Sequence, residues 1–217
     1  MARRILSCFV IVFLGVCSET TERAPLPDYF PLEDGLFWEY EVTDITYSLT
    51  EAPKVDHFFQ KERLSRISDK TYKVELFTKK EPQEGWLFDA VGSISVNENR
   101  LLRNEAGISK VIQFVPMSDG LIWNQNAFNT SSESTVSTSR KGEPFSRFQN
   151  TIWVIEKQDS SLISKDCIYA VYGEGLGLVY QEITDIEYCQ TSADCIGSGE
   201  IDSGKRYTKT LISSGKE

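Results

Sequence analysis

Runs in which apolar and polar residues alternate with a period of two constrain the fold of this chain more than any other feature. In the run from Trp38 to Thr43, every second residue is a Trp, Tyr or Val, and the residues between them are polar. Such alternation gives a β-strand one apolar and one polar face. Beyond this run the apolar residues are Ile45 and Tyr47, which occupy the opposite positions of the alternation. This change predicts a bulge or a break of the strand near Asp44. The same criteria predict further strands at 58–66, 72–76, 86–96, 110–115, 148–156, 166–172, 176–188 and 206–212.

Turn-forming residues separate these runs, and few segments have helical spacing. Asp34-Gly35, Asp119-Gly120 and the glycine-rich segment 173–177 supply the turns. This arrangement favours sequential antiparallel hairpins over βαβ units. Residues 130–139, eight of which are Ser or Thr, are predicted to form a mobile loop. The expected fold is all-β: an antiparallel, strongly curved sheet or open half-barrel of about nine strands.

One segment of eight residues recurs in the chain. Residues 31–38, Pro-Leu-Glu-Asp-Gly-Leu-Phe-Trp, return as 116–123, Pro-Met-Ser-Asp-Gly-Leu-Ile-Trp, with five identical positions. One interpretation is a pair of similar turn-to-strand corners that seat Trp38 and Trp123 in the core, because Trp brings a large apolar area to a core. The other is a paired binding site in which the two indoles are stacking platforms. The first is favoured, and no full duplication is inferred.

The first 17 residues are typical of an export signal. Arg3 and Arg4 precede an apolar run from Ile5 to Leu14, which is too short to span a bilayer. The run is followed by Gly15, Val16 and Cys17. A cysteine there, three residues after a Leu, resembles the acceptor of a bacterial lipoprotein, although Val16 stands where a smaller residue is usual. The competing interpretation is an ordinary cleavage after Ser18, which would leave the protein secreted or periplasmic and soluble.

Lipidation at Cys17 would anchor the mature chain to a membrane. Two or three acyl chains, palmitate among them, suffice for stable binding. The predicted organisation is a signal peptide at 1–16, a lipidated cysteine and polar tether at 17–28, and a single β domain at 29–217. The expected location is the outer membrane of the cell, facing the periplasm or the exterior.

The charge balance disfavours nucleic acid as a partner. The chain carries 23 basic and 32 acidic residues, and its formal charge of −9 becomes about −11 when Arg3 and Arg4 are removed with the signal. Nucleic acids are bound by Lys and Arg that neutralise phosphates. The partners expected instead are the membrane, through the anchor, and a hydrophobic ligand or another envelope protein.

Three cysteines remain in the mature domain. Cys189 and Cys195 bracket a short polar segment and form the expected disulfide, which would shape a loop. Cys167 lies in an apolar run and is predicted to be a buried free thiol. A bridge from Cys167 to either of the other two remains open, because sequence does not fix connectivity.

Several short motifs together resemble uncharacterised Gram-negative envelope lipoproteins. They are Pro31-Leu32 followed by Gly35, Trp38 and Tyr40, the late segment 172–180 (Tyr-Gly-Glu-Gly-Leu-Gly-Leu-Val-Tyr), and 207–212 (Tyr-Thr-Lys-Thr-Leu-Ile). The resemblance spans most of the mature chain. It implies an anchored β domain and supplies no catalytic residues.

No constellation of catalytic or metal-binding residues is recognisable in the sequence. His57 is the single histidine and stands in an ordinary strand run, so it is not expected to be a general base. Zinc sites need four Cys or His ligands in close pairs, and the acidic pairs lack the spacing of a calcium loop. The segment 173–177 lacks the Lys and helix of a phosphate loop. We therefore expect no cofactor, no metal and no enzymatic activity.

The leading functional hypothesis is a noncatalytic, lipid-anchored envelope protein with a binding or scaffolding role. The alternative is a carrier of a lipid or other hydrophobic ligand in a half-barrel cavity. Trp38, Trp86 and Trp123 are the candidate ligand-facing aromatics. A hydrolase would need two carboxylates to converge in a cleft, and a glycan-binding surface would need exposed coplanar aromatics.

Overall fold

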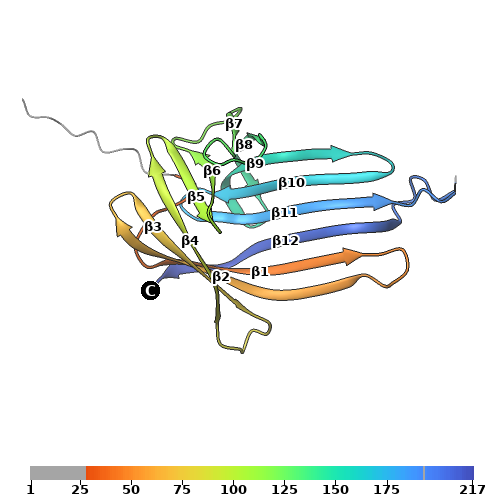
Figure 1. Ribbon diagram of the computed structural model, residues 1–217, viewed down its shortest axis with the longest axis horizontal. Helices are drawn as coiled ribbons and strands as arrows, with labels where there is room; N and C mark the ends of the chain where they lie inside the picture. The colour runs from red at the N-terminus through yellow and green to blue at the C-terminus, as the bar shows by residue number, and fades with distance from the viewer. Residues whose placement is uncertain (1–27, 193) are drawn as a thin grey trace, which may run out of the picture.

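The computed structural model describes residues 28–192 and 194–217, which form one antiparallel sheet of 12 strands (Figure 1). The strand order is β6-β5-β4-β3-β2-β1-β12-β11-β10-β9-β8-β7, so β1 and β12 are the only neighbours in this sheet that are not consecutive in sequence. The strands are β1 (Leu36–Tyr47), β2 (Lys54–Ser68), β3 (Thr71–Lys79), β4 (Leu87–Asn97), β5 (Arg100–Glu105), β6 (Ile108–Phe114), β7 (Ile122–Asn124), β8 (Thr135–Phe145), β9 (Phe148–Ser160), β10 (Ser164–Gly173), β11 (Gly177–Tyr188) and β12 (Ile201–Lys216).

The sheet curves until its two edges nearly meet, which makes it barrel-like. At the seam between β6 and β7, the Val111 N–H donates to the Gln125 carbonyl at 2.8 Å. The Trp123 indole N–H donates to the Val111 carbonyl at 2.9 Å. The predicted all-β antiparallel class is thus confirmed, whereas about nine strands was too few.

The three strands that the sequence did not predict are β5, β7 and β8. β7 has only three residues, too few for an alternation pattern to be visible. β8 begins at Thr135, inside the segment predicted to be a mobile loop, and that prediction was wrong for 135–139. Ser and Thr join the ladder there because β9 supplies hydrogen-bond partners and Val136 supplies a buried anchor.

One end of the barrel is closed by the segment that precedes β1. Tyr29 and Phe30 are buried there, and the Phe30 ring lies 5.4 Å from that of Trp38. The Gly175 N–H donates to the Asp28 carbonyl at 2.7 Å, and the Tyr72 hydroxyl donates to the Leu32 carbonyl at 3.0 Å. The segment therefore connects distant strands across the base, where the core is packed.

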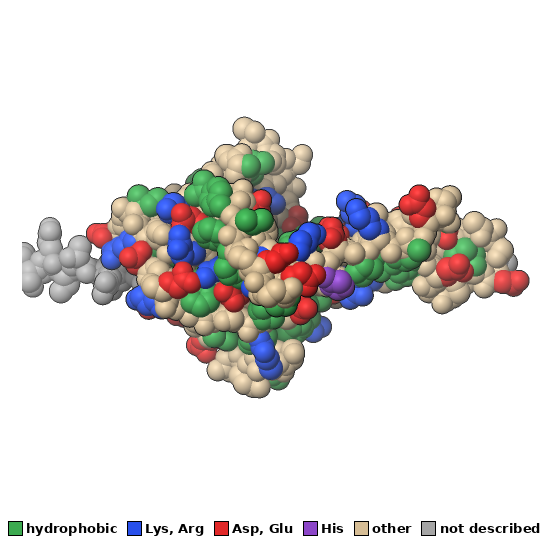
Figure 2. Space-filling view, turned by 90° about the horizontal axis from the view of Figure 1, so that it is seen from below, with side chains coloured by type: hydrophobic (Ala, Val, Ile, Leu, Met, Phe, Trp, Pro, Cys, Tyr) green, Lys and Arg blue, Asp and Glu red, His purple; other side chains and the backbone are tan. Residues whose placement is uncertain are grey.

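Away from this base, six strands from β9 through β12 and β1 to β2 continue as a sheet that projects from the barrel body (Figures 1 and 2). This projection explains the change of apolar phase in β1. The only register shift of β1 lies between Glu39 and Tyr40 on the β12 side. The strand runs without a bulge or a break through Asp44, so the prediction of either at that position was wrong. Ile45 and Tyr47 lie where the sheet no longer encloses a core. No inner face there requires an apolar side chain at the positions that continue the series Trp38, Tyr40 and Val42.

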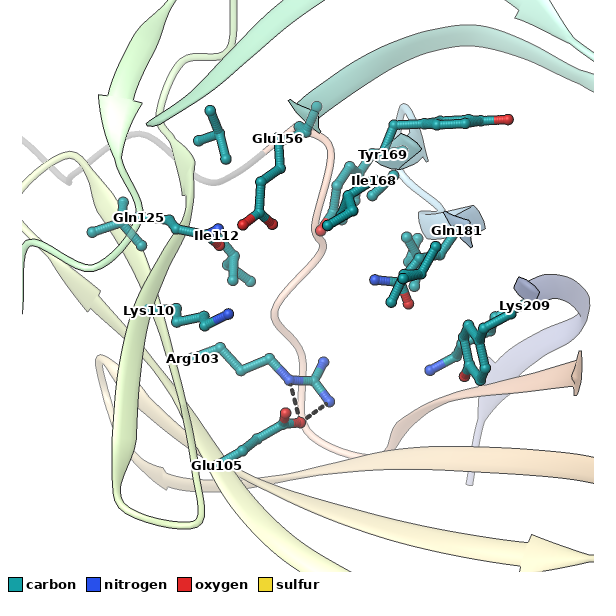
Figure 3. A pocket seen from close by; sticks show the side chains of 18 of the residues that line it. Arg103, Glu105, Lys110, Ile112, Gln125, Glu156, Ile168, Tyr169, Gln181 and Lys209 are labelled. Atoms are coloured by element: carbon teal, nitrogen blue, oxygen red, sulfur yellow. Dashed lines mark hydrogen bonds and ion pairs between the residues drawn. The ribbon is translucent and has the colours of Figure 1, made fainter. Parts of the chain in front are cut away.

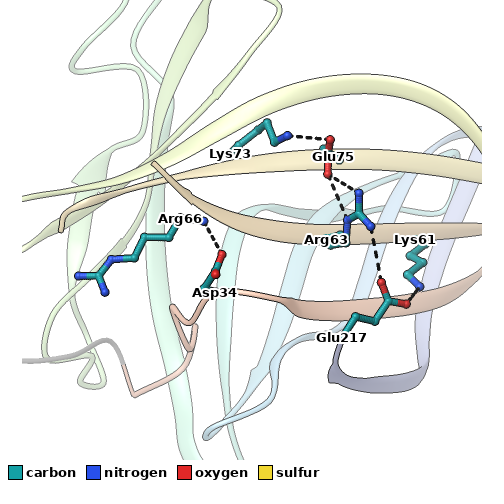
Figure 4. Close-up of polar contacts among 7 residues, drawn as sticks. All are labelled: Asp34, Lys61, Arg63, Arg66, Lys73, Glu75 and Glu217. Atoms are coloured by element: carbon teal, nitrogen blue, oxygen red, sulfur yellow. Dashed lines mark hydrogen bonds and ion pairs between the residues drawn. The ribbon is translucent and has the colours of Figure 1, made fainter. Parts of the chain in front are cut away.

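The recurring segment forms two equivalent corners. At the first, the Gly35 N–H donates to the Leu64 carbonyl and Asp34 accepts the Arg66 backbone N–H at 2.7 Å (Figure 4). At the second, the Gly120 N–H donates to the Thr138 carbonyl and Asp119 accepts the Lys141 backbone N–H at 2.7 Å. Both glycines have positive φ, 79° and 74°, which an L side chain rarely adopts. Each corner thus contacts the second strand of a six-stranded meander, β2 in β1–β6 and β8 in β7–β12.

Candidate functional site

The barrel-like sheet holds a cavity of about 680 Å³ that is open to solvent on one side and is the candidate site (Figure 3). Pockets for small molecules commonly measure about 300 to 1,000 Å³. The cavity lies above the packed base and is lined from strands on both sides of the seam. Its size therefore suits one small or medium-sized ligand.

One wall of the cavity is apolar because inward positions of β6 to β11 carry aliphatic and aromatic side chains. Trp123 packs at 5.6 Å against Phe114 and is 7% exposed, so its ring is fixed rather than mobile. Burying a ligand's apolar part against such a wall contributes about 25 cal/mol per Å². The apolar lining includes Val111, Ile112, Trp123, Val136, Val154 and Ile168.

The floor of the cavity is a buried cluster of three charges. Glu62 on β2 accepts a hydrogen bond from Arg103 on β5 at 2.8 Å and from Lys209 on β12 at 2.6 Å. The three side chains are 3%, 17% and 7% exposed, respectively. Each stands two positions from a buried leucine on its own strand, namely Leu64, Leu101 and Leu211. Inward alternation therefore places a charged layer directly above an apolar one.

Electrostatics lock this floor in its charged form. Burial by itself raises the pKa of the Glu62 carboxyl, but the Arg103 and Lys209 cations outweigh it and hold that pKa well below its usual range. Burial lowers the pKa of Lys209, and Glu62 opposes that effect. The Lys209 ammonium also lies 4.1 Å from the centre of the Tyr40 ring. Since a general acid needs a raised pKa, Glu62 is a fixed charge and not a proton donor.

Two neighbouring tyrosines complete the polar floor. Burial raises the pKa of Tyr172 and that of Tyr207, each to about 12. Both side chains line the cavity and stay neutral at physiological pH. They add aromatic surface beside the ion pairs without adding charge.

A second polar group of the cavity spans the seam. The Gln125 amide donates to the Ser134 hydroxyl at 2.8 Å, and that hydroxyl donates to the Glu156 carboxylate at 2.7 Å. Lys110, the direct cross-strand partner of Arg103, also lines the cavity. Figure 3 shows the ends of Lys110 and Glu156 directed into the space. Lys110 is exposed and Glu156 half-buried, so a ligand can reach both, whereas Gln125 is buried.

The structure places the three candidate ligand-facing aromatics in different environments. Trp123 lines the cavity. Trp38 does not, because it lies in the base at 2% exposure and donates its indole N–H to the Leu176 carbonyl. Trp86 is also outside the cavity lining and lies beneath the Lys79 ammonium at 4.5 Å from the ring centre.

The cysteines of the β domain are arranged as the sequence predicted. Cys189 and Cys195 form a disulfide in the loop between β11 and β12. Cys167 is a buried free thiol. Cys17, the predicted lipid acceptor, lies outside the described residues, as do the signal peptide and all but the last residue of the tether.

A glycan-binding surface would need exposed coplanar aromatic rings, and one pair of nearly coplanar rings is present. Trp153 and Tyr169 stack with ring centres 4.8 Å apart and planes inclined by 14°. Arg140 lies 4.4 Å from the Trp153 ring centre, and Tyr180 tilts against Tyr169 at 5.9 Å. The ring faces contact protein groups, so this cluster stabilises the sheet and offers no open platform.

Sequence reasoning missed the charged floor. A signal was present, because Glu62 falls at an inward position of a predicted strand, between Gln60 and Leu64. A charged residue at such a position is seldom buried without partners. The partners, Arg103 and Lys209, are 41 and 147 residues away, and only the strand order brings them together.

No protein-family profile matches the sequence, and no curated protein is a recognisable relative. Within residues 28–192 and 194–217, no helix is long and apolar enough to cross a membrane. No three His, Cys, Asp or Glu side chains of that same part of the chain lie close enough to hold a metal ion.

Proposed function

We propose that this chain is a noncatalytic, lipid-anchored envelope protein that binds an amphipathic ligand inside its barrel. The cavity of about 680 Å³, with its apolar wall and charged floor, is the observation that carries the proposal. The apolar wall suits a hydrocarbon portion, and the polar groups suit a head. The carrier alternative thereby gains over a purely scaffolding role.

Membrane attachment through Cys17 is the second part of the proposal. It is supported by the basic start, the short apolar run and the cysteine that follows it. Ten residues, 18–27, lie between Cys17 and the first described residue, Asp28. In an extended chain they would reach roughly 35 Å, enough to hold the barrel clear of the lipid headgroups.

Ligand binding can be tested with 8-anilinonaphthalene-1-sulfonate, an apolar fluorophore with one charged group. The mature chain carrying Cys17→Ser, which requires no detergent, should bind one molecule with enhanced fluorescence. Ala170→Trp places an indole in the cavity lining and should weaken binding at least about tenfold, which corresponds to 1.4 kcal/mol. Ala52→Trp adds the same ring to an exposed loop and should leave binding unchanged.

Urea unfolding of each variant establishes that it is folded, and Val154→Trp replaces Ala170→Trp if the latter is not. Equal binding by the cavity and loop variants would overturn the proposal. So would the absence of binding to the unmodified domain.

A further inference from the structure

The charges that line the cavity sum to zero. Three are acidic, Glu62, Glu105 and Glu156, and three are basic, Arg103, Lys110 and Lys209. Four of them neutralise one another, because Arg103 pairs with both Glu62 and Glu105 while Lys209 pairs with Glu62. One cation and one anion are left over.

These two are Lys110 and Glu156. No described residue forms an ion pair with either of them, and the Glu156 carboxylate accepts a hydrogen bond from a neutral hydroxyl only. They do not pair with each other, although Figure 3 shows both directed into the same cavity. Unneutralised charges of opposite sign facing one cavity are typical of a site for a ligand that carries both signs.

The basic side of this arrangement has a further reason to attract an anion. Arg103 and Lys110 are direct partners in the ladder between β5 and β6. Like charges directly opposite each other are destabilising. Arg103 already has Glu62 and Glu105 as counter-charges, so an acidic group of a ligand at this place would supply the counter-charge that Lys110 lacks.

The acidic side is held in place rather than free. The Ser134 hydroxyl links Glu156 to the Gln125 amide, and the Gln125 carbonyl accepts the Val111 N–H across the seam. A carboxylate fixed in this way presents a constant acceptor to an ammonium group, and charge-assisted hydrogen bonds are about twice as strong as neutral ones.

We infer that the cavity is specific for a zwitterionic amphiphile. The acidic group of the ligand lies beside Lys110 and Arg103, its ammonium lies beside Glu156, and its hydrocarbon part lies on the apolar wall. This inference rests on the proposed function and names its ligand class. A purely anionic amphiphile of equal chain length binds less well, because it leaves Glu156 without a counter-charge and places a negative group near it.

The test compares three probes by isothermal titration calorimetry, below the concentration at which they form micelles and at one ionic strength. They are lysophosphatidylethanolamine, lysophosphatidylglycerol with the same acyl chain, and free phosphoethanolamine. We expect the zwitterionic lysolipid to bind about tenfold more tightly than the anionic one, as for one charge-assisted hydrogen bond. Phosphoethanolamine should bind at least about a hundredfold more weakly than the lysolipid, because it lacks the apolar part.

Two substitutions separate the two ends of the head group. Glu156→Gln should remove the preference by weakening the zwitterionic probe about tenfold while sparing the anionic one. Lys110→Gln should weaken both lysolipids. Lys70→Gln and Glu133→Gln remove one charge of each sign from exposed positions outside the cavity lining and should change neither affinity.

Each outcome bears on a separate part of the reasoning. If both lysolipids bind equally, or if Glu156→Gln preserves the preference, the head-group inference is overturned while the binding function stands. If free phosphoethanolamine binds as tightly as the lysolipid, the ligand is the head group alone. If neither the lysolipids nor the fluorophore binds, the proposed function itself fails.

Discussion

Replacing Glu62 by Gln tests whether the charged floor of the cavity is as dry as its burial implies. The substitution keeps the size of the side chain and removes its charge. It leaves Lys209, with its side chain 7% exposed, without an anion, and it leaves Arg103 with Glu105 alone. Glu75 provides a matched control, because it also joins two cations, Arg63 and Lys73 (Figure 4).

The two sites differ mainly in solvent exposure. The cations around Glu75 are 38% and 40% exposed, against 17% and 7% around Glu62. Removing one partner from a buried ion pair costs about 3 to 5 kcal/mol, whereas an exposed pair contributes about 1 kcal/mol at most. For a domain of this size, the Glu62→Gln loss corresponds to a fall in Tm of roughly 6 to 20 °C.

Urea unfolding of Glu62→Gln and Glu75→Gln at pH 7, followed by circular dichroism, measures the two losses in free energy of unfolding. Replacing Glu62 and Lys209 together by Met should recover more than half of the loss, because no buried charge is then left uncompensated there. Equal losses at the two glutamates would refute the reasoning. The floor would then be hydrated like the outer surface.

Three further predictions concern stability. Because the folded pKa of Glu62 lies below its ordinary value of 4.5, its stabilisation is complete above that value and declines as the pH falls toward the folded pKa. The free-energy difference between the unmodified domain and Glu62→Gln should therefore shrink below pH 4.5, and a constant difference would contradict the depressed pKa. Gly204→Ala should lower the free energy of unfolding by about 2 kcal/mol or more, because Gly204 has a φ of +120° and an added Cβ would clash with a carbonyl oxygen of β11. Gly85 has open space around it, so Gly85→Ala should be nearly neutral when both variants are unfolded with urea. Replacing Cys189 and Cys195 by Ser should cost about 2 kcal/mol, as their separation of 6 residues closes only a short loop; a loss above the Glu62→Gln value would show that the loop has a larger structural role.

The alternation of apolar and polar residues predicted the strands that bury one continuous face. It failed for strands that bury few residues or that extend beyond the barrel. The strands at 58–66 and 72–76, for example, carry buried Leu64 and Val74 at regular inward positions. β8 was missed because Val136 and Thr138 are its only buried residues, and its Ser and Thr neighbours are also typical of loops. The change of phase at Ile45 was misread as a bulge because the sequence does not show where a strand leaves the barrel.

The sequence predicted the similar Asp-Gly corners because their chemistry is local. A turn built on Asp-Gly, with the glycine at positive φ, needs only a few adjacent residues. The backbone N–H groups that the two aspartates accept, those of Arg66 and Lys141, belong to other strands and could not be read from the turn itself. The environments of the two tryptophans that follow these corners depend on residues distant in the sequence. Trp38 enters the packed base, whereas Trp123 reaches the cavity wall, since the segment with Tyr29 and Phe30 covers one end of the barrel only.

By itself, the sequence determined the all-β class, most of the strands, the Cys189–Cys195 bridge and the buried Cys167, because all of these follow from short-range periodicity or from residues close together in the chain. Only the tertiary structure decided that β1 pairs with β12, that the edges β6 and β7 approach each other, and that a cavity forms between them. The charged floor depends on all three strands β2, β5 and β12. Its ion pairs join residues up to 147 positions apart, and a period of two specifies which face a side chain takes but not which distant strand will face it.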